Sequence, residues 1–268
     1  MGLAYDRRGS GPALVLLHGL GHRRQAWHQV TDLLVPHRTV ITVDLPGHGE
    51  SAPLAAAGRS AVAAIAEGIL GFLDEMGLDR PHIAGNSLGG ALALIAGARG
   101  RAATVTALSP AGFWANGWEF RYARAIFMAG QRAAPVVRPA VPVLARTTLG
   151  RWLIDGAFVA RPSRMPARQA AADALAFFAA RDTVRSVLAE QVSFSESGET
   201  VPVGVPVTIA WGSRDYVLPP GQARVAMRHL PGARFVPLPG CGHVPMTDAP
   251  TLVARVLLEG SEPHGDLS

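Results

Sequence analysis

The chain has 268 residues, of which 49% are hydrophobic and 17% are charged. This length and composition predict one folded domain, with room for an insertion, and argue against a disordered chain. The first apolar run, residues 13–17, is too short for the core of a signal peptide or for a membrane span. We therefore expect a soluble, cytoplasmic protein that does not insert stably into a membrane.

All 25 basic residues are arginine, and the formal net charge is +5. The excess is modest, and no helix-turn-helix, zinc-finger or RNA-binding pattern accompanies it, so we expect no nucleic-acid partner. The single cysteine, Cys241, rules out an internal disulfide, and nothing in the chain requires an oxidising compartment. Cys241 is either an oxidisable thiol or a small packed residue, and the second interpretation is favoured.

The first part of the chain alternates short β-branched or aliphatic runs with longer stretches rich in alanine and leucine. This alternation is typical of a parallel sheet wound with helices, an α/β fold. It predicts strands over residues 13–17, 39–43, 81–85 and 103–109. The predicted helices between them cover 25–35, 60–76 and 88–98, and Ser60 is placed to cap the second of these.

The alternation stops after residue 112, and five prolines divide the following stretch into what reads as several short helices. Strands are again predicted over 205–211 and 233–238, with one helix between them and another over 248–258. The sequence therefore predicts an α/β core formed by residues 1–112 and 201–268, with a helical cap inserted at 113–200. The polar end of the chain, 260–268, is expected to fray.

The insertion holds 11 of the chain's 17 aromatic residues, and its front part, 113–168, carries nine arginines against two acids, Glu119 and Asp155. One interpretation is a set of helices packed on the sheet with solvated arginine faces. The other is an apolar lid over a pocket, with arginines at its rim that meet an anionic substrate or a membrane surface. The sequence leaves both open. Four residues are candidates for the pocket wall: Phe113, Trp114, Trp118 and Val244.

The strongest local pattern is Gly-Asn-Ser-Leu-Gly-Gly at 85–90, which follows a predicted strand and opens a predicted helix. A serine on such a tight turn has strained backbone angles, so the residues two positions away must be small. Gly85 and Gly89 meet that requirement. The turn would present the Ser87 hydroxyl at a helix N-terminus, where backbone N–H groups favour developing negative charge. Ser87 is therefore the candidate nucleophile.

A serine hydroxyl needs a base, and the base needs an acid to orient it. His243 is the candidate base, because it lies in the glycine-rich loop directly after the last predicted strand. Asp215, just beyond the strand that ends near residue 211, is the candidate acid; the alternative is an aspartate that caps a turn. The chain order of Ser87, Asp215 and His243 matches that of a nucleophile-elbow triad. Loop-bracing or surface roles are assigned to four other histidines: His18, His22, His28 and His48.

Five segments of the chain resemble those of the α/β-hydrolase superfamily and occur in its order, at 18–21, 44–51, 85–90, 211–215 and 242–243. The matches extend over almost the whole chain. The resemblance implies an eight-stranded, mostly parallel sheet with the helical cap inserted after the sixth strand. It also implies that the segment at Asp44 is a structural turn and does not supply the triad acid.

The resemblance implies acyl-transfer chemistry as well. The backbone N–H groups of Leu20 and Leu88 would form the oxyanion hole. Ser87 would attack a carbonyl, His243 would take its proton and Asp215 would hold the imidazole. Water would then release the acid from the acyl-enzyme. No metal and no organic cofactor is implied.

Differences between the motifs of this chain and those of related families limit the reactions that we expect it to catalyse. Epoxide hydrolases and haloalkane dehalogenases of this fold use an aspartate nucleophile, and Ser87 argues against both. Proline iminopeptidases usually have tryptophan where this chain has Leu88. The Gly-Asn-Ser elbow is similar to that of carbon–carbon bond hydrolases of ring-cleavage products, but those usually have tryptophan at the position of Val244.

We therefore expect a serine hydrolase that cleaves a carboxylic ester of a largely apolar small molecule. Thioesterase and lactonase activities use the same groups and stay open, as does carbon–carbon bond hydrolysis. A different class also stays open, namely a member of the fold that binds a ligand without hydrolysing it. The complete set of Ser87, Asp215 and His243 favours catalysis.

Overall fold

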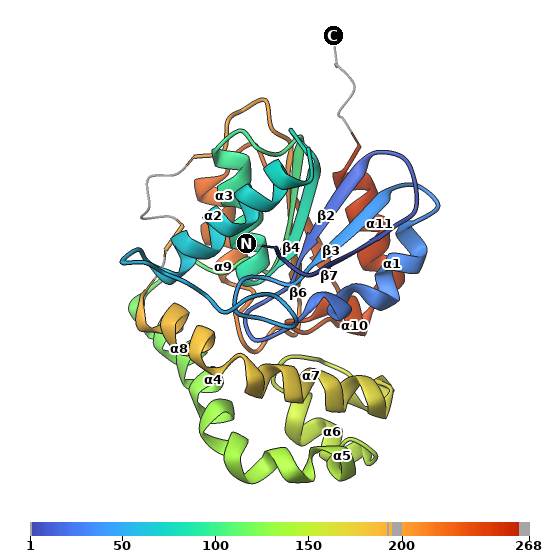
Figure 1. Cartoon of the computed structure of the whole chain (residues 1–268), viewed down its shortest axis with the longest axis vertical. Coiled ribbons are helices and arrows are strands. Elements are labelled where there is room, and N and C mark those ends of the chain that lie inside the picture. The colour runs from blue at the N-terminus through green and yellow to red at the C-terminus, as the bar shows by residue number, and fades with distance from the viewer. Residues whose placement is uncertain (1, 192, 195–199, 263–268) are drawn as a thin grey trace.

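The computed structural model describes residues 2–191, 193–194 and 200–262. Within them, seven strands form one sheet in the order β1-β3-β2-β4-β5-β6-β7 (Figure 1). The strands are β1 (Tyr5–Arg8), β2 (Ala13–Leu17), β3 (Thr39–Val43), β4 (His82–Asn86), β5 (Thr104–Leu108), β6 (Val207–Gly212) and β7 (Arg234–Leu238). The predicted α/β fold is confirmed.

The sheet is parallel from β3 to β7, and β1 pairs antiparallel with β3 at one edge. β3, β5 and β6 are buried along their whole length, as is usual for parallel strands covered on both faces. Because the strands are parallel, their carboxyl ends meet at one edge of the sheet. The loops that follow β2, β4, β6 and β7 all leave the sheet there.

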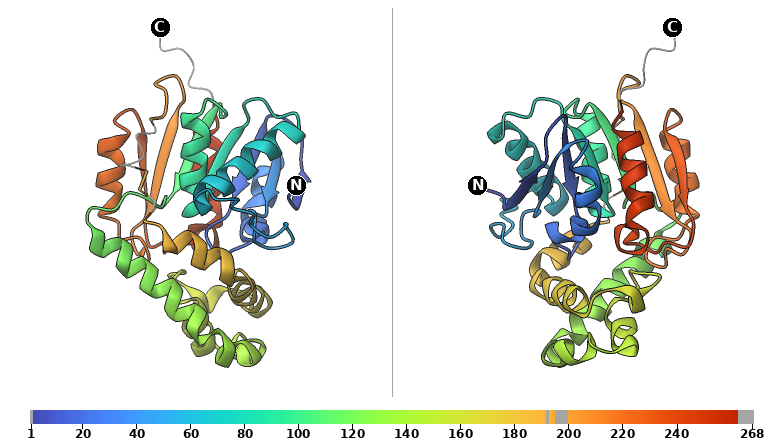
Figure 2. Two further views of the ribbon diagram at one scale, coloured as in Figure 1. Left: turned by 60° about the vertical axis from the view of Figure 1, so that its left-hand side comes forward. Right: turned by 90° about the vertical axis from the view of Figure 1, so that its right-hand side faces the viewer.

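Helices cover both faces of the sheet (Figures 1 and 2). One face carries α2 (Ala61–Glu75), α3 (Leu88–Ala98) and α9 (Gln222–His229), which share one apolar core. The opposite face has a second core around η1 (Arg24–Trp27), α1 (His28–Leu34), α10 (Pro245–Asp248) and α11 (Pro250–Gly260). The sheet is therefore packed against helices on both of its faces.

The helices between β5 and β6 lie together at the carboxyl edge of the sheet, at the bottom of Figure 1. They are α4 (Gly117–Val137), η2 (Arg138–Ala140), α5 (Val141–Leu144), α6 (Thr148–Asp155), η3 (Pro162–Arg164), α7 (Ala167–Ala179) and α8 (Arg181–Ala189). The predicted helical insertion between two strands is confirmed. Its first helix is longer than expected, because Pro135 lies in the last turn of α4, where a missing N–H removes only one bond near the helix end.

Two expectations about the sheet need correction. The resemblance implied eight strands with the insertion after the sixth, whereas the described residues form seven and the insertion follows the fifth. β1 was not predicted, because Tyr5–Arg8 is polar and mostly exposed at the sheet edge. At the other end of the chain, α11 continues to Gly260, and the residues 263–268 lie outside the described part.

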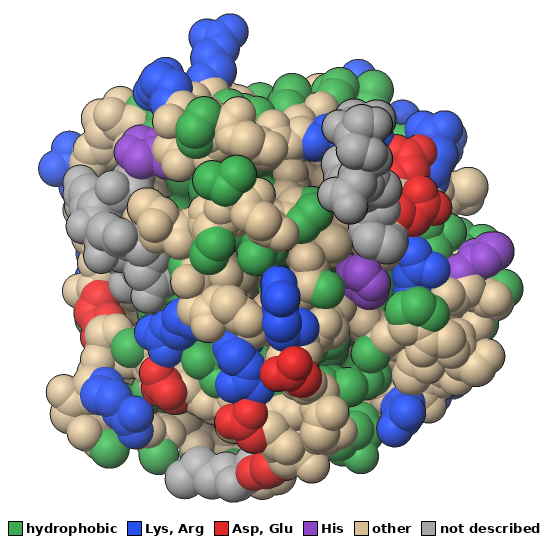
Figure 3. All heavy atoms as spheres, turned by 90° about the horizontal axis from the view of Figure 1, so that it is seen from above, with side chains coloured by type: hydrophobic (Ala, Val, Ile, Leu, Met, Phe, Trp, Pro, Cys, Tyr) green, Lys and Arg blue, Asp and Glu red, His purple; other side chains and the backbone are tan. Residues whose placement is uncertain are grey.

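The end of the molecule opposite the insertion carries arginine and acidic side chains side by side (Figure 3). Exposed or half-exposed ion pairs on the surface outside the insertion include Arg101 with Asp74 at 2.6 Å and Arg234 with Glu259 at 2.5 Å. Such surface pairs contribute little to stability. Among the described helices, none has the length and apolar character needed to cross a membrane.

A buried leucine on α2 tests the assignment of the core. Leu73 is fully buried, so Leu73→Ala should lower the free energy of unfolding by about 2–5 kcal/mol, through lost apolar burial and a cavity. Urea denaturation followed by circular dichroism measures the change. Leu149 is 71% exposed, and Leu149→Ala should change stability by no more than ~0.5 kcal/mol. Equal losses in the two variants would contradict this packing.

Candidate active site

Ser87 stands on the turn between β4 and α3, with backbone angles φ 57° and ψ −119°. Residues with a side chain rarely adopt a positive φ, so this turn stores strain. Three backbone hydrogen bonds hold it. The Ser87 N–H donates to the Leu108 carbonyl at 2.9 Å, and the Ser87 carbonyl accepts from Ala91 at 3.0 Å and Ala111 at 3.1 Å. The backbone of Ser87 is therefore fixed at the N-terminus of α3.

Close backbone packing explains the glycines around Ser87. A Cβ atom on Gly85 would overlap the Gly89 carbonyl, and one on Gly89 would overlap the carbonyl oxygen of Leu17 at the end of β2. On Gly19, a Cβ atom would lie 3.2 Å from the Cβ of Ser87. The loop after β2 and the first turn of α3 thus pack directly against the serine.

The candidate base and acid, which follow β7 and β6, are hydrogen bonded to each other. Asp215 Oδ2 lies 2.8 Å from His243 Nδ1, and both side chains are buried. The other carboxylate oxygen, Oδ1, accepts the backbone N–H groups of Val217 at 2.9 Å and Leu218 at 2.8 Å. Asp215 therefore caps a turn with one oxygen and is hydrogen bonded to the imidazole with the other.

Asn86, which the sequence analysis gave no role, connects this pair to the serine turn. Its side-chain nitrogen donates to the His243 carbonyl at 2.8 Å and to the Leu108 carbonyl at 3.1 Å. Asn86 and His243 are 157 positions apart in the chain. The one signal for such a role in the sequence is the place of Asn86 directly before Ser87.

The second ring nitrogen of His243, Nε2, is buried and has no hydrogen-bond partner among the described residues. Ser87 is also buried and lines a cavity of about 230 Å³. The structure thus joins His243 to Asp215 directly and to the serine turn through Asn86, whereas no hydrogen bond links Ser87 to Nε2 within the described part of the chain. An imidazole oriented by a carboxylate, with its second nitrogen free, can accept a proton.

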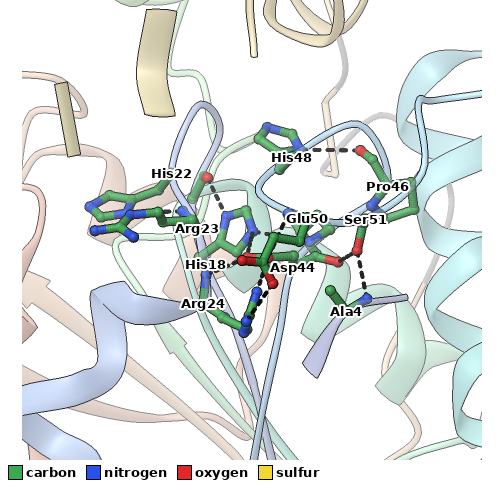
Figure 4. A network of polar contacts seen from close by, with 12 residues as sticks. Ala4, His18, His22, Arg23, Arg24, Asp44, Pro46, His48, Glu50 and Ser51 are labelled. Atoms are coloured by element: carbon green, nitrogen blue, oxygen red, sulfur yellow. Dashed lines mark hydrogen bonds and ion pairs between the residues drawn. The ribbon is translucent and has the colours of Figure 1, made fainter. Parts of the chain in front are cut away.

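Two buried histidines brace the loop after β2 (Figure 4). His18 Nε2 accepts the Leu45 N–H at 3.0 Å, and His48 Nε2 accepts the Gly21 N–H at 3.0 Å. Burial is the main reason that the pKa of each ring is lowered, well below its usual value for His18 and to about 4 for His48. Both rings are therefore neutral at neutral pH, as an accepting nitrogen requires. The bracing role expected for these two residues is what the structure contains.

Asp44 belongs to the same network, and one of its carboxylate oxygens lies 3.9 Å from His18 Nε2 (Figure 4). Its carboxylate accepts the Arg24 backbone N–H at 2.6 Å, the Arg24 guanidinium at 2.5 Å and the Glu50 N–H at 2.9 Å. The same guanidinium pairs with Asp6 and Glu50. The segment at Asp44 is therefore a bracing turn, and the acid that contacts His243 is Asp215.

The backbone N–H groups of Leu20 and Leu88 have no acceptor among the described residues. Leu88 opens α3, where the first N–H groups of a helix lack partners within the helix. Leu20 lies between Gly19, which packs against Ser87, and Gly21, which His48 holds. Two free donors thus flank the serine turn.

The cavity beside Ser87 is lined mainly by apolar side chains from the core and from the insertion, and the candidate wall residue Trp114 is one of them. The other three candidate wall residues do not line this cavity. Phe113 is fully buried in the core and Trp118 is 57% exposed on α4, while Val244 lines a second cavity. Composition alone identifies aromatic residues in the insertion, but which of these side chains line a cavity depends on how its helices pack.

Among the described residues, no group of three or more His, Cys, Asp or Glu is arranged to hold a metal ion.

The thiol of Cys241 provides a test of packing around the loop of His243. Cys241 is buried, and burial raises the pKa of its thiol to about 11. Since the thiolate is the reactive form, dithionitrobenzoate at pH 8 should modify the folded protein at least ~100-fold more slowly than the protein in urea. Absorbance of the released thiolate measures both rates. Comparable rates would contradict a packed, unreactive cysteine.

The neutral ring of His48 gives a pH dependence of stability. In the unfolded chain this histidine titrates near 6.5, whereas in the folded protein its pKa is about 4. Between these values the unfolded state binds more protons, so stability falls as the pH is lowered from about 6.5 to about 4. His48→Gln should lose less stability over this interval in urea titrations, whereas exposed His37→Gln should behave as the wild type. Equal pH slopes in all three proteins would rule out the buried neutral ring.

Comparisons with known proteins agree with this architecture. A family model described as "Alpha/beta hydrolase family" matches residues 14–256. An uncharacterised protein of Mycobacterium tuberculosis is 30% identical over 264 residues, covering 92% of this chain and 74% of its own. A second protein of that organism, described as an epoxide hydrolase, is 30% identical over 214 residues, covering 75% of this chain and 97% of its own. The solved structure of a thermophilic esterase from Thermogutta terrifontis has a TM-score of 0.74 at 22% identity, with 96% of this chain and 92% of that chain covered. The chain belongs to the α/β-hydrolase family.

Proposed function

We propose that this α/β hydrolase cleaves a carboxylic ester, or a closely related acyl bond, of a largely apolar small molecule. The observation that carries the proposal is the hydrogen-bonded pair of Asp215 and His243, tied through Asn86 to the strained serine turn. A hydroxyl, an imidazole and a carboxylate are the groups that acyl transfer through a covalent intermediate needs.

Ser87 is the nucleophile in this mechanism. Its Oγ attacks the carbonyl carbon of the substrate while Nε2 of His243 takes the hydroxyl proton, and Asp215 stabilises the resulting imidazolium. The imidazolium gives its proton to the leaving alcohol, and the acyl group stays on Ser87. Water, activated by His243, then attacks the acyl carbon and the acid is released. Contacts between nucleophile and base are often loose without substrate, so we expect the hydroxyl to turn toward Nε2 when substrate binds.

The backbone N–H groups of Leu20 and Leu88 form the oxyanion hole. The absence of other acceptors for them among the described residues supports this role. So does the close packing of Gly19 on Ser87, which brings the loop after β2 to the reacting atom. Donors held in place before the reaction stabilise the charge that develops on the carbonyl oxygen.

Residues 113–200 act as a cap over a core of residues 1–112 and 201–268. The cavity beside Ser87 supports this division, because its wall combines Leu88 and Ala91 of α3 with Phe120 and Phe127 of α4. A substrate enclosed between core and cap is shielded from water, and the apolar wall favours an apolar acyl group.

Thioesters, lactones and the carbon–carbon bonds of ring-cleavage products are alternative substrates for the same groups. Epoxide hydrolysis, the activity in the description of one curated relative, is disfavoured because epoxide hydrolases of this fold use an aspartate where this chain has Ser87. A protein that only binds a ligand is disfavoured by the orientation of the His243 ring.

Removal of the nucleophile tests the proposal. Ser87→Ala should lower kcat/KM for a short p-nitrophenyl ester by about 10⁴ or more, because no other group can carry the acyl intermediate. Release of p-nitrophenolate measures the rate. Ser163→Ala, at an exposed position in the insertion, is the matched control and should keep wild-type activity.

Two outcomes would refute the proposal in different ways. Wild-type turnover by Ser87→Ala would exclude this nucleophile. A wild-type protein that binds esters, thioesters, lactones and ring-fission dienoates but hydrolyses none of them would instead favour a ligand-binding role.

A further inference from the structure

A second cavity, of about 260 Å³, lies between the insertion, the loop after β2 and the segment that follows His243. Phe158 and Val244 line it, and the Phe158 ring centroid lies 6.4 Å from that of His243. Leu20 lines both this cavity and the one beside Ser87. The two cavities therefore flank the proposed catalytic groups, one on the serine side and the other on the histidine side.

Two aspartates interrupt the otherwise mostly apolar wall of this cavity. Asp155, the last residue of α6, is 7% exposed, and Asp173, on α7, is 8% exposed. Ionised carboxylates are rarely this buried without partners, because burial removes their hydration. Each carboxyl is therefore either protonated or paired with a cation, which the protein or a ligand supplies.

Asp173 has a cationic partner within the protein at one of its two oxygens, Oδ1, whereas its Oδ2 is buried without a hydrogen bond in the described part of the chain. Arg23 Nη2 lies 3.4 Å from Oδ1, and His22 Nε2 lies 4.0 Å from Oδ2. Burial is the main cause of the lowered pKa of His22, so this ring is neutral at pH 7. The charge of Asp173 is therefore balanced by Arg23.

Asp155 has no cationic partner in the described part of the chain, and its Oδ2 is also buried without a hydrogen bond. Burial, and then repulsion from Asp173, raise the pKa of this carboxyl to about 8. Its place at the C-terminal end of α6 adds an unfavourable helix dipole. The turn after α6 uses only the backbone carbonyl of Asp155, which accepts from Phe158 and Val159. Within the described residues, Oδ2 therefore contributes no hydrogen bond to the fold.

We propose that this cavity binds a protonated amine carried by the alcohol part of the ester substrate, with Asp155 as its carboxylate partner. The inference rests on the proposed function, because His243 protonates the leaving alcohol and the alcohol part therefore lies on the histidine side. An ammonium N–H supplies the hydrogen bond that Oδ2 lacks, and its charge favours the ionised carboxylate. The rings of Phe158 and Phe177 in the same wall suit a cation. The substrate class is an apolar acid esterified with an amino alcohol.

A matched pair of esters tests this inference. One is 4-(dimethylamino)butyl butanoate, which carries a protonated amine at pH 7, and the other is 5-methylhexyl butanoate, in which a CH group replaces the charged NH group. Asp155→Asn should lower the ratio of kcat/KM, amine ester over neutral ester, by about 10- to 100-fold, since it removes a charge-assisted hydrogen bond. The neutral ester should be hydrolysed as by the wild type. Asp182→Asn, which removes an exposed acid from the same insertion, should leave the ratio unchanged.

The possible failures are distinguishable. An unchanged ratio in Asp155→Asn would overturn the inference while leaving ester hydrolysis intact. Loss of activity on both esters together with a lower Tm would also overturn it, because the carboxyl would then support the fold. If the wild type hydrolyses neither of these esters nor the p-nitrophenyl ester, the proposed function fails, and a binding measurement then tests the inference by itself. Dimethylbutylammonium should raise the Tm of the wild type but not of Asp155→Asn, and equal shifts would overturn the inference.

Discussion

The hydrogen bond from the Asn86 amide to the His243 carbonyl is the contact on which the geometry of the site depends. It joins the end of β4 to the loop after β7, across two intervening strands. The backbone of His243 is thus held from the serine turn, while its ring is held by Asp215. A parallel sheet makes this possible, because it brings the loops after several strands to one edge, where the rigid strands hold them in position.

Much of the fold could be predicted, because its strands are continuous apolar runs. The predictions for 13–17 and 39–43 match β2 and β3, and Ser60 caps α2 by accepting the Ala63 N–H at 3.1 Å. β1 escaped prediction because its polar side chains leave only backbone pairing with β3 to define it. The helices of the insertion were harder to predict because prolines can end a helix or, as Pro135 does, sit within its last turn.

Some features of the site could likewise be predicted from the sequence, whereas others could not. Short motifs identify residues whose chemistry and neighbours are local, such as the glycines that permit the turn of Ser87. The role of Asn86 depends on a partner 157 positions away, and no local pattern records it. Pocket walls are harder still, because Phe113 and Trp118 lie close together in the sequence, yet one is in the core and the other at the surface. The unpartnered carboxyl of Asp155 also emerges only when the packing of α6 and α7 is known.

The central claim is that Ser87 becomes covalently acylated during turnover. A fluorophosphonate ester traps such a nucleophile, and tandem mass spectrometry of the digested protein identifies the modified residue. We predict a single phosphonyl group on the peptide that contains Ser87, and none when the protein is denatured before treatment. Modification of a different residue, or no modification of a protein that hydrolyses esters, would contradict the account.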